Sequence, residues 1–260
     1  MVYSSPAPEN FLAEYAAIFP TVEVDQWFWS LPNPATVTEY ASSVGGDFRF
    51  TIKAPNSITL TNTYRHAKKN AGERNPDFLS VDLARRFLSA ITPLQMRTDA
   101  IIFQFEYLNR TKMAGLTVLL ELLEPFLASL PDGWPYAVEL RNPNFLKRPY
   151  FEMLYRQGVV HVFSEGYYMP PVTDIYRYYH DLLISRSVIR LLGTERAQMD
   201  EVAGKRWDRR LSPKDEDLRR TAAMVLDMLD HDFDVTVNVN NHYEGSAPKT
   251  IEVLQKYLAS

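Results

Sequence analysis

Charged and amide side chains recur at alternate positions in several short apolar stretches of this sequence. Residues 136–143 are one case, because Glu139 and Arg141 fall on one side of a predicted strand while Val138 and Leu140 fall on the other. Successive side chains of a strand point to opposite faces, so a carboxylate and a guanidinium share a face here. Such a pair can transfer a proton and hold an anion.

Three of these residues are candidates for catalysis. Glu139 and Glu23 would act as general acid and base, since two carboxylates in one site of low dielectric differ in how readily each gives up its proton. Arg141 would hold an anion, or stabilise an enolate or oxyanion. The remaining candidates would bind the ligand, and they are Asp25, Trp27, Lys53, Gln104, Glu106, Glu165, Arg190, Asn238, Asn240 and Asn241.

Two other interpretations of these polar residues stay open. The charges could form a structural network of ion pairs, because buried charges must be paired and hydrogen-bonded. Residues 245–248, with the sequence Gly-Ser-Ala-Pro, could present backbone amides to a phosphate at a helix start. The same four residues could equally be a tight turn.

The histidines do not have the spacing of a metal site. His161 falls on the polar face of a predicted strand and His242 follows the last strand, whereas His66, His180 and His231 fall in a loop or in helices. Cations near Asp25, Glu106 and Glu165 argue against an acidic Mg²⁺ site. We therefore predict no metal and no cofactor, and interpret His161 as a hydrogen-bonded core residue.

Nucleic acid is an alternative partner. The connection after Lys53 is basic, through Arg65, His66, Lys68, Lys69 and Arg74, and aromatic side chains that could stack on bases or sugars are Trp27, Trp29, Tyr64, Tyr107, Tyr167, Tyr168 and Trp207. The sequence contains no recognised nucleic-acid motif. A small ligand is therefore the preferred partner, and nucleic acid the second.

The elements that must position these residues alternate between strands and helices. Predicted strands cover residues 21–28, 48–53, 100–106, 136–141, 159–165, 188–193 and 234–241, with helices between them. This alternation predicts a parallel sheet. An open sheet covered by helices on both faces should be apolar on both, whereas nearly every strand here has one polar face. A TIM-like (β/α) barrel of seven recognisable strands, forming a single domain over residues 1–260, explains the pattern.

Composition narrows the class of protein. The chain has 260 residues, 46% of them hydrophobic, which is enough for one large α/β barrel. It has no cysteine, which excludes disulfides and thiolate nucleophiles. A formal net charge of −4 gives no general attraction to nucleic acid or to anionic membranes. No stretch has the length of a membrane span or the pattern of a secretory signal, so we expect a cytoplasmic protein with no membrane partner.

Several motifs resemble the uncharacterised YecE-like family of TIM-barrel proteins, also called DUF72. The resemblance rests on residues 21–32 (TVEVDQWFWSLP), 48–55 (FRFTIKAP), 137–142 (AVELRN) and 238–241 (NVNN), which occur in the family's order. The chain departs from the family pattern at Asp25, where Asn is usual, and at Leu192, where His is usual. The family also opens with a strand that residues 1–10 do not match, so either the barrel has seven strands or these residues fill the gap irregularly.

The resemblance implies a relation to barrels of the sugar-isomerase type, and fold alone does not give function. Together with the polar strand faces, it leads us to expect a pocket for a small anionic or polyhydroxylated ligand, such as a sugar or sugar phosphate. If the protein is an enzyme, metal-independent isomerase, lyase or hydrolase chemistry is expected. The alternative is a non-catalytic protein that binds a metabolite or nucleic acid, with a structural ion-pair network. The sequence does not indicate whether the protein is a monomer or an oligomer.

Overall fold

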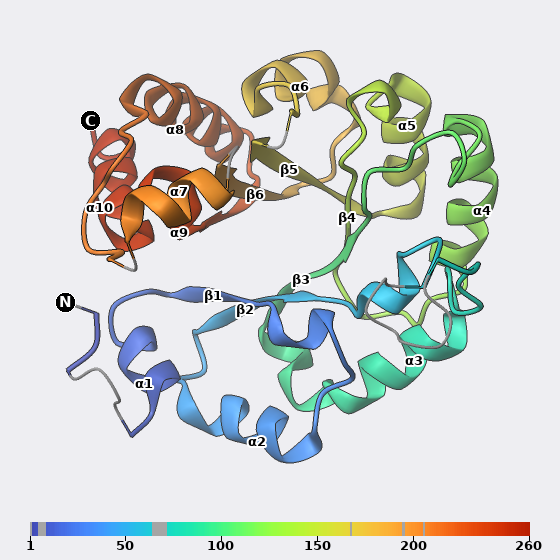
Figure 1. Cartoon of the computed structure of the whole chain (residues 1–260), viewed down its shortest axis with the longest axis horizontal. Helices are drawn as coiled ribbons and strands as arrows, with labels where there is room; N and C mark the ends of the chain where they lie inside the picture. Colours follow the sequence, from blue (N-terminus) through green and yellow to red (C-terminus); the bar gives the residue numbers. More distant parts are fainter. Residues whose placement is uncertain (1, 5–8, 64–71, 167, 194–195, 205) are drawn as a thin grey trace. The chain divides into compact units, whose positions relative to one another are not determined.

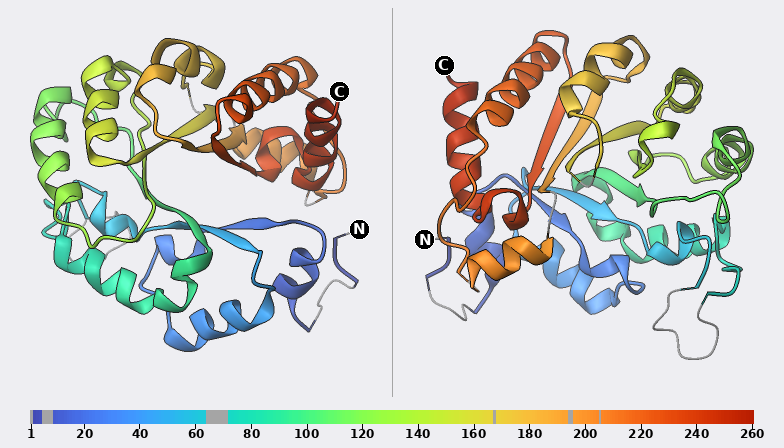
Figure 2. Two further views of the ribbon diagram at one scale, coloured as in Figure 1. Left: turned by 180° about the vertical axis from the view of Figure 1, so that it is seen from behind. Right: turned by 45° about the horizontal axis from the view of Figure 1, so that its top comes forward.

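A computed structural model describes residues 2–4, 9–63, 72–166, 168–193, 196–204 and 206–260. The chain divides into two compact units, Met1–Leu140 and Arg141–Ser260. Figure 1 shows the elements of each unit, and Figure 2 gives two further views. Within the described ranges, no helix is both long and apolar enough to cross a membrane.

The unit Met1–Leu140 contains four parallel strands that follow one another in chain order. They are β1 (Thr21–Val24), β2 (Arg49–Lys53), β3 (Thr98–Gln104) and β4 (Tyr136–Glu139). The α-helices are α1 (Phe11–Ala16), α2 (Pro34–Ser43), α3 (Val81–Ala90) and α4 (Leu116–Ala128), and the 3-10 helices are η1 (Gln26–Phe28), η2 (Asn56–Ile58) and η3 (Thr92–Arg97). Helices α2 and α3 lie on the same side of β1 and β2 in both figures.

Local sequence explains where these helices begin. Asn33 caps α2 by accepting a hydrogen bond from the backbone of Ala35 (2.9 Å), and Pro34 occupies the first helical position. An Asn followed by Pro favours a helix start, because the side-chain oxygen satisfies an otherwise unpaired amide and proline needs no donor there. Ser80 caps α3 through the amide of Leu83 in the same way (3.2 Å).

The unit Arg141–Ser260 contains three parallel strands, again in chain order. They are β5 (Val160–Gly166), β6 (Arg186–Gly193) and β7 (Asp234–Val239). The helices are η4 (Pro143–Phe145), α5 (Arg148–Gln157), α6 (Val172–Tyr179), η5 (His180–Leu182), α7 (Arg196–Ala203), α8 (Asp215–Asp230), α9 (Asn241–Glu244) and α10 (Ala247–Leu258). Helices α8 and α10 lie side by side in every view. Gly158 ends α5 in a left-handed conformation, which glycine adopts readily at the end of a helix.

Backbones approach very closely at the carboxyl ends of β5 and β6. A Cβ atom on Gly166 would lie 2.3 Å from the carbonyl oxygen of Gly193, and one on Gly193 would lie 2.2 Å from the carbonyl oxygen of His242. Both glycines have positive φ angles, 118° and 81°. Only glycine fits this geometry, which brings the ends of two strands and the start of α9 into backbone contact.

The predicted polar faces of the strands are buried. Glu139 is fully buried on β4, and Arg190 is 2% exposed on β6. Six candidate residues were wrongly placed on strands, because those strands end earlier than expected. Strand β1 ends at Val24, so Asp25 directly follows it and Trp27 lies in η1. Strand β3 ends at Gln104, β4 at Glu139 and β7 at Val239, so Glu106, Arg141, Asn240 and Asn241 lie in the segments that follow.

Other differences lie in the connections. The segment 194–211 was predicted as a charged connection, but it contains α7, and α9 begins at Asn241, within the predicted last strand. Helix α4 continues through Pro125 as one element. The predicted basic residues Arg65, His66, Lys68 and Lys69, together with Tyr64 and Tyr167, lie outside the described residues. Among residues 2–4 and 9–10, none belongs to a strand.

Candidate functional site

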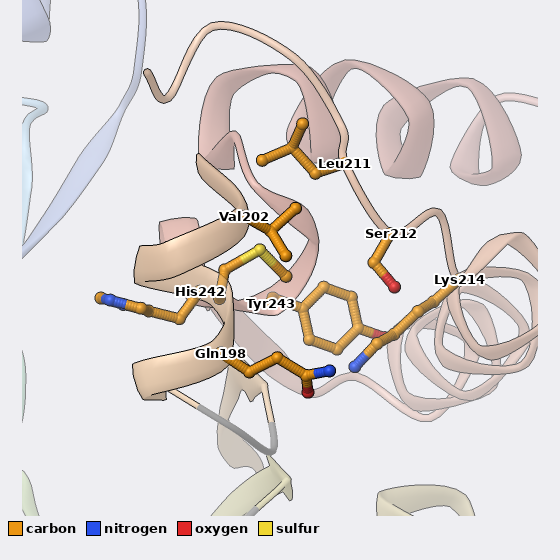
Figure 3. A pocket seen from close by; sticks show the side chains of 8 residues that line it. Gln198, Val202, Leu211, Ser212, Lys214, His242 and Tyr243 are labelled. Carbon is orange, nitrogen blue, oxygen red and sulfur yellow. The ribbon is translucent and has the colours of Figure 1, made fainter. Parts of the chain in front are cut away.

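A pocket follows the carboxyl ends of β6 and β7, in the unit Arg141–Ser260 (Figure 3). Its volume is about 280 Å³, and its walls come from α7, the segment 211–214 and α9. Gln198, Ser212, Lys214 and Tyr243 supply polar groups, and its other lining residues are Met199, Val202, Leu211 and His242. Ligand sites of (β/α) folds lie at this end of the strands, so the position itself favours a functional role.

Tyr243 forms part of the wall of this pocket. Its side chain is fully buried, and its hydroxyl has no hydrogen-bond partner among the residues that the structure describes. The Lys214 ammonium lies 4.5 Å from the centre of the Tyr243 ring. Figure 3 shows the Ser212 hydroxyl and the Gln198 amide pointing toward the same space, while the His242 ring points away. A buried hydroxyl without a hydrogen-bond partner lowers the stability of the protein. A ligand that pairs with this hydroxyl therefore gains binding free energy.

Burial raises the pKa of the Tyr243 phenol, and the negative charges of Glu165 and Asp217 raise it further. The phenol is therefore neutral at physiological pH and can donate a hydrogen bond. With an ammonium, a hydroxyl and a carboxamide beside it, the pocket is rich in donors. Such a set suits an anion or a ligand with several hydroxyl groups.

A buried carboxylate fixes the wall of the pocket at residues 211–214. Glu244 is fully buried and accepts hydrogen bonds from Nε and Nη2 of Arg210 (2.8 and 2.7 Å) and from the Thr250 hydroxyl (2.7 Å). The backbone amides of Leu211 and Ser212 donate to the Glu244 carbonyl (2.5 and 3.1 Å). Because this carboxylate is both paired and hydrogen-bonded, it holds the segment against α9 and α10.

Glu165 is the second-last residue of β5, and the charges of Asp217 and Lys214 act on it. One of its oxygens accepts a hydrogen bond from the backbone of Val172 (3.0 Å). Burial raises the pKa of Glu165, the Val172 hydrogen bond opposes that rise, and the charge of Asp217 adds to it. The positive charge of Lys214 lowers the pKa of Glu165, so the two side chains are near enough to interact. A carboxyl group with a raised pKa is suited to proton transfer near neutral pH.

The predicted asparagines stabilise the turn after β7. The side-chain oxygen of Asn240 accepts from the backbone of His242 (2.9 Å), and that of Asn241 accepts from the backbone of Ala247 (2.8 Å). The Gly245 amide donates to the Asn241 carbonyl (2.7 Å). Two of the four positions in residues 245–248 thus have bonded amides and Pro248 has none, which favours the tight turn over the phosphate site.

His242 connects α9 to α7. Its Nε2 lies 2.9 Å from the Asp200 carboxylate, and its ring contacts that of Trp207, with 5.0 Å between the centroids. His161 is instead a core residue, as predicted, because its Nδ1 lies 3.1 Å from the Tyr150 hydroxyl and phenylalanine rings surround it. No group of three or more His, Asp or Glu side chains within the described ranges is arranged to hold a metal ion.

In the unit Met1–Leu140, the structure brings three of the predicted residues together. Lys53 is 7% exposed, and its ammonium lies 2.6 Å from Asp25 and 3.7 Å from Glu23. The same ammonium lies 5.3 Å from the Phe28 ring centre. Trp27 is 2% exposed and packs against Tyr40, so its interior position does not suit stacking on bases.

The other predicted residues are distributed over several strands. Gln104 is buried on β3 and Asn238 lies half-buried on β7. Glu106 is paired with Lys112 and with the Thr61 hydroxyl, neither of which the sequence indicated. Two strands separate Glu23 on β1 from Glu139 on β4, and Arg141 begins the second unit. The acid–base roles of Glu139 and Glu23, and the anion-binding role of Arg141, stay predictions.

The pocket residues Gln198, Ser212, Lys214 and Tyr243 were not among those predicted. The prediction considered side chains on the strands, whereas these four lie in segments that follow them. Two signals were available, the Ser212-Pro213 helix start beside Lys214 and the run His242-Tyr243-Glu244-Gly245 directly after the last strand. In (β/α) folds such segments carry the site, so they should have been included.

Comparisons with known proteins agree on one family. The model of the family described as "Protein of unknown function DUF72" matches residues 1–260. The UPF0759 protein YecE of Escherichia coli K12 is 29% identical over 148 residues, which cover 57% of this chain and 47% of YecE. YecE of strain O157:H7 matches equally well, so the chain spans about half the length of the curated relatives it matches.

Solved structures of the same family share the fold. The DUF72 protein EF0366 of Enterococcus faecalis V583 matches with a TM-score of 0.70 at 20% identity, covering 96% of this chain and 88% of that one. TM1631 of Thermotoga maritima MSB8 matches with a TM-score of 0.66 at 22% identity, covering 96% and 89%. The predicted fold class, a TIM-like α/β barrel fold with parallel strands, is thereby confirmed. From its motifs, its fold and the match over its whole length, the chain belongs to the DUF72 family.

Proposed function

We propose that the protein binds a small anionic, hydroxylated metabolite of the sugar-phosphate class in the pocket formed by α7, residues 211–214 and α9. The observation that carries this proposal is the buried Tyr243 hydroxyl, which has no hydrogen-bond partner in the described residues and lies in a pocket that Lys214 also lines. The ammonium would hold the anionic group, and the phenol, the Ser212 hydroxyl and the Gln198 amide would bind oxygen atoms of the ligand.

Proton-transfer chemistry is the proposed reaction type, of the isomerase or lyase kind, with hydrolysis as its variant. Glu165 supports this choice, because burial holds its pKa above the ordinary value and its charge interacts with that of Lys214. A carboxyl group of this kind can pass a proton to a ligand atom and take it back. The predicted pair Glu139 and Glu23 remains the competing acid–base assignment.

Ligand binding is tested with a thermal-shift panel of sugar phosphates, the corresponding free sugars and inorganic phosphate. A ligand that binds only the folded state at a hundredfold excess over Kd adds about 2.7 kcal/mol of stability. We expect a shift from a sugar phosphate and a smaller one from its free sugar. The Lys214→Met and Tyr243→Phe variants should lose the shift, since each removes one polar group and keeps most of the side chain.

Matched controls are available on α10. Lys249 is exposed and paired with Glu252 at 2.9 Å, and Tyr257 lies against the Arg219 guanidinium. Lys249→Met and Tyr257→Phe should therefore keep the full shift. If Lys214→Met and Tyr243→Phe keep it as well, the ligand lies elsewhere and the proposed site is wrong.

Catalysis has its own test, once a substrate is in hand. Glu165→Gln should keep most of the ligand affinity and abolish turnover, because an interaction made only in the transition state appears in kcat rather than in binding. Glu139→Gln is the parallel variant for the competing assignment. Whichever variant binds without turnover identifies the acid or base, and turnover by both would exclude both as essential.

Single-stranded nucleic acid is the second candidate, favoured by aromatic side chains at the surface. Trp29, Tyr107 and Tyr168 are 62%, 59% and 90% exposed, and all three lie in connections that follow strands. Exposed rings stack on bases without sequence preference. Binding to a short oligonucleotide that falls steeply with salt and is weakened by Trp29→Ala would support this candidate. Affinity that does not change with salt would exclude it.

A further inference from the structure

We propose that a second cavity, in the unit Met1–Leu140 beside β1, binds a small organic cation such as a substituted ammonium ion. The cavity has a volume of about 230 Å³. Aromatic rings line it from several elements: Tyr3, Phe11 and Tyr15 from the N-terminal segment and α1, and Tyr40 from α2. Glu23, at the end of β1, and Asp25, directly after it, also line the cavity. The cavity shares no residue with the Tyr243 pocket, although Glu23 also belongs to the competing acid–base pair.

The rings of this cavity are held in place by their own contacts. Tyr3 meets Phe11 edge to face, with 5.1 Å between ring centroids, and Tyr40 packs on the buried Trp27 at 5.6 Å. Tyr15 contacts Phe19 at 4.8 Å. Cations bind to the faces of tyrosine and tryptophan rings through the ring quadrupole. Rings positioned in advance avoid the cost of ordering them when a ligand arrives.

The phenols of the cavity are uncharged at neutral pH. Burial raises the pKa of Tyr3 and of Tyr40, and it raises the pKa of Tyr15 to about 12. The negative charge of Glu14 also raises the pKa of Tyr3, and that of Glu39 also raises the pKa of Tyr40. These two carboxylates therefore lie near enough to make the potential at the rings more negative.

The N-terminal segment that forms the cavity carries acidic side chains and no basic ones. Residues 1–48 contain six acidic side chains and no Lys, Arg or His. This segment includes α1, β1, η1 and α2, which supply every residue that lines the cavity apart from Tyr3 and Asp25. Lys53, on β2, offsets part of this charge, because its ammonium lies 2.6 Å from Asp25 and 3.7 Å from Glu23. A wall of this kind repels an anion and attracts a cation.

The combination of aromatic rings and carboxylates favours an organic cation over a metal ion or a sugar. A metal ion would find oxygen ligands here but gain little from the rings. A sugar would use the rings but not the negative potential. An ammonium ion with methyl or methylene groups uses both, since its charge meets the carboxylates and its carbon atoms meet the ring faces.

The test compares choline with 3,3-dimethylbutan-1-ol, a neutral alcohol of the same shape in which carbon replaces nitrogen. Binding is followed by calorimetry and by tryptophan fluorescence, to which Trp27, packed on Tyr40, contributes together with the other three tryptophans. We expect saturable binding of choline and binding of the alcohol that is weaker by about tenfold or more, because only choline carries the charge that cation–π and carboxylate contacts require.

Three variants of the full-length protein locate the site. Glu23→Gln should weaken choline binding, and Tyr40→Phe should keep it, because phenylalanine retains the ring face. Asp47→Asn removes a charge from the same acidic segment outside the cavity, so it should leave binding unchanged. Equal binding of choline and the alcohol, no saturable binding of choline at millimolar concentration, or equal effects of Glu23→Gln and Asp47→Asn would overturn the proposal.

Discussion

The buried hydroxyl of Tyr243 has no hydrogen-bond partner in the described part of the chain, which makes this residue informative about function. Leaving such a group unpaired lowers stability, whereas phenylalanine keeps the ring and removes the unpaired group. We expect Tyr243→Phe to raise the free energy of unfolding by about 1 kcal/mol in urea, while abolishing ligand binding. Tyr257→Phe is the control for both measurements. A variant that is less stable than the wild type would mean that the hydroxyl has a partner after all.

Glu165 makes stability depend on pH in a defined direction. Burial raises its pKa in the folded protein above the ordinary value of 4.5. A raised pKa of an acid means that the folded state holds the proton more tightly, so this contribution is complete below pH 4.5 and is lost as the pH rises through the folded pKa. Glutamine at this position does not titrate. Glu165→Gln should therefore gain stability relative to the wild type across that window.

Urea unfolding of both proteins at several pH values measures this difference. Glu252→Gln is a contrast of opposite sign, because the hydrogen bond from Lys249 lowers the pKa of Glu252. There the wild type should lose stability relative to the variant as the pH falls. Curves for Glu165→Gln and the wild type that run parallel over the whole range would show that Glu165 is not shifted.

At the scale of elements, two glycines play different roles in the same unit. Gly158 ends α5 with a φ of 62°, and a Cβ atom at this position would meet no neighbouring atom within 4 Å, whereas Gly193 ends β6 against the backbone of His242. Gly158→Ala should cost about 1 kcal/mol, which is the strain of a left-handed residue alone. Gly193→Ala should cost several times more, because backbone must also move. Equal losses in urea unfolding would contradict the close approach.

At the scale of the whole molecule, the question is whether the two compact units unfold together. The prediction of one domain over residues 1–260 implies a single cooperative transition, and the likeness to EF0366 covers 96% of the chain as one match. We expect coincident urea transitions from tryptophan fluorescence and circular dichroism. Two separated transitions would show that Met1–Leu140 and Arg141–Ser260 unfold independently.

The sequence by itself determined the order of the seven strands and of most of the helices between them, but not α7 or α9. Alternating stretches such as residues 136–141 identified the strands, and cap residues such as Asn33 and Gly158 located helix ends, because these signals depend on neighbours in the chain. The motifs also identified the family. Strand ends were less well predicted, as Asp25 and Glu106 show, since the residue at which a strand ends depends on its pairing partner.

Only the tertiary structure decided which polar groups meet. Lys214 and Tyr243 are far apart in sequence, and neither belongs to a strand, so no periodicity connects them. Their contact depends on Glu244, which holds residues 211–214 against α9 and α10, and on glycines that let backbones touch at the strand ends. Burial, hydrogen-bond satisfaction and close approach are properties of three-dimensional packing, and they are what distinguish a site from a set of polar residues.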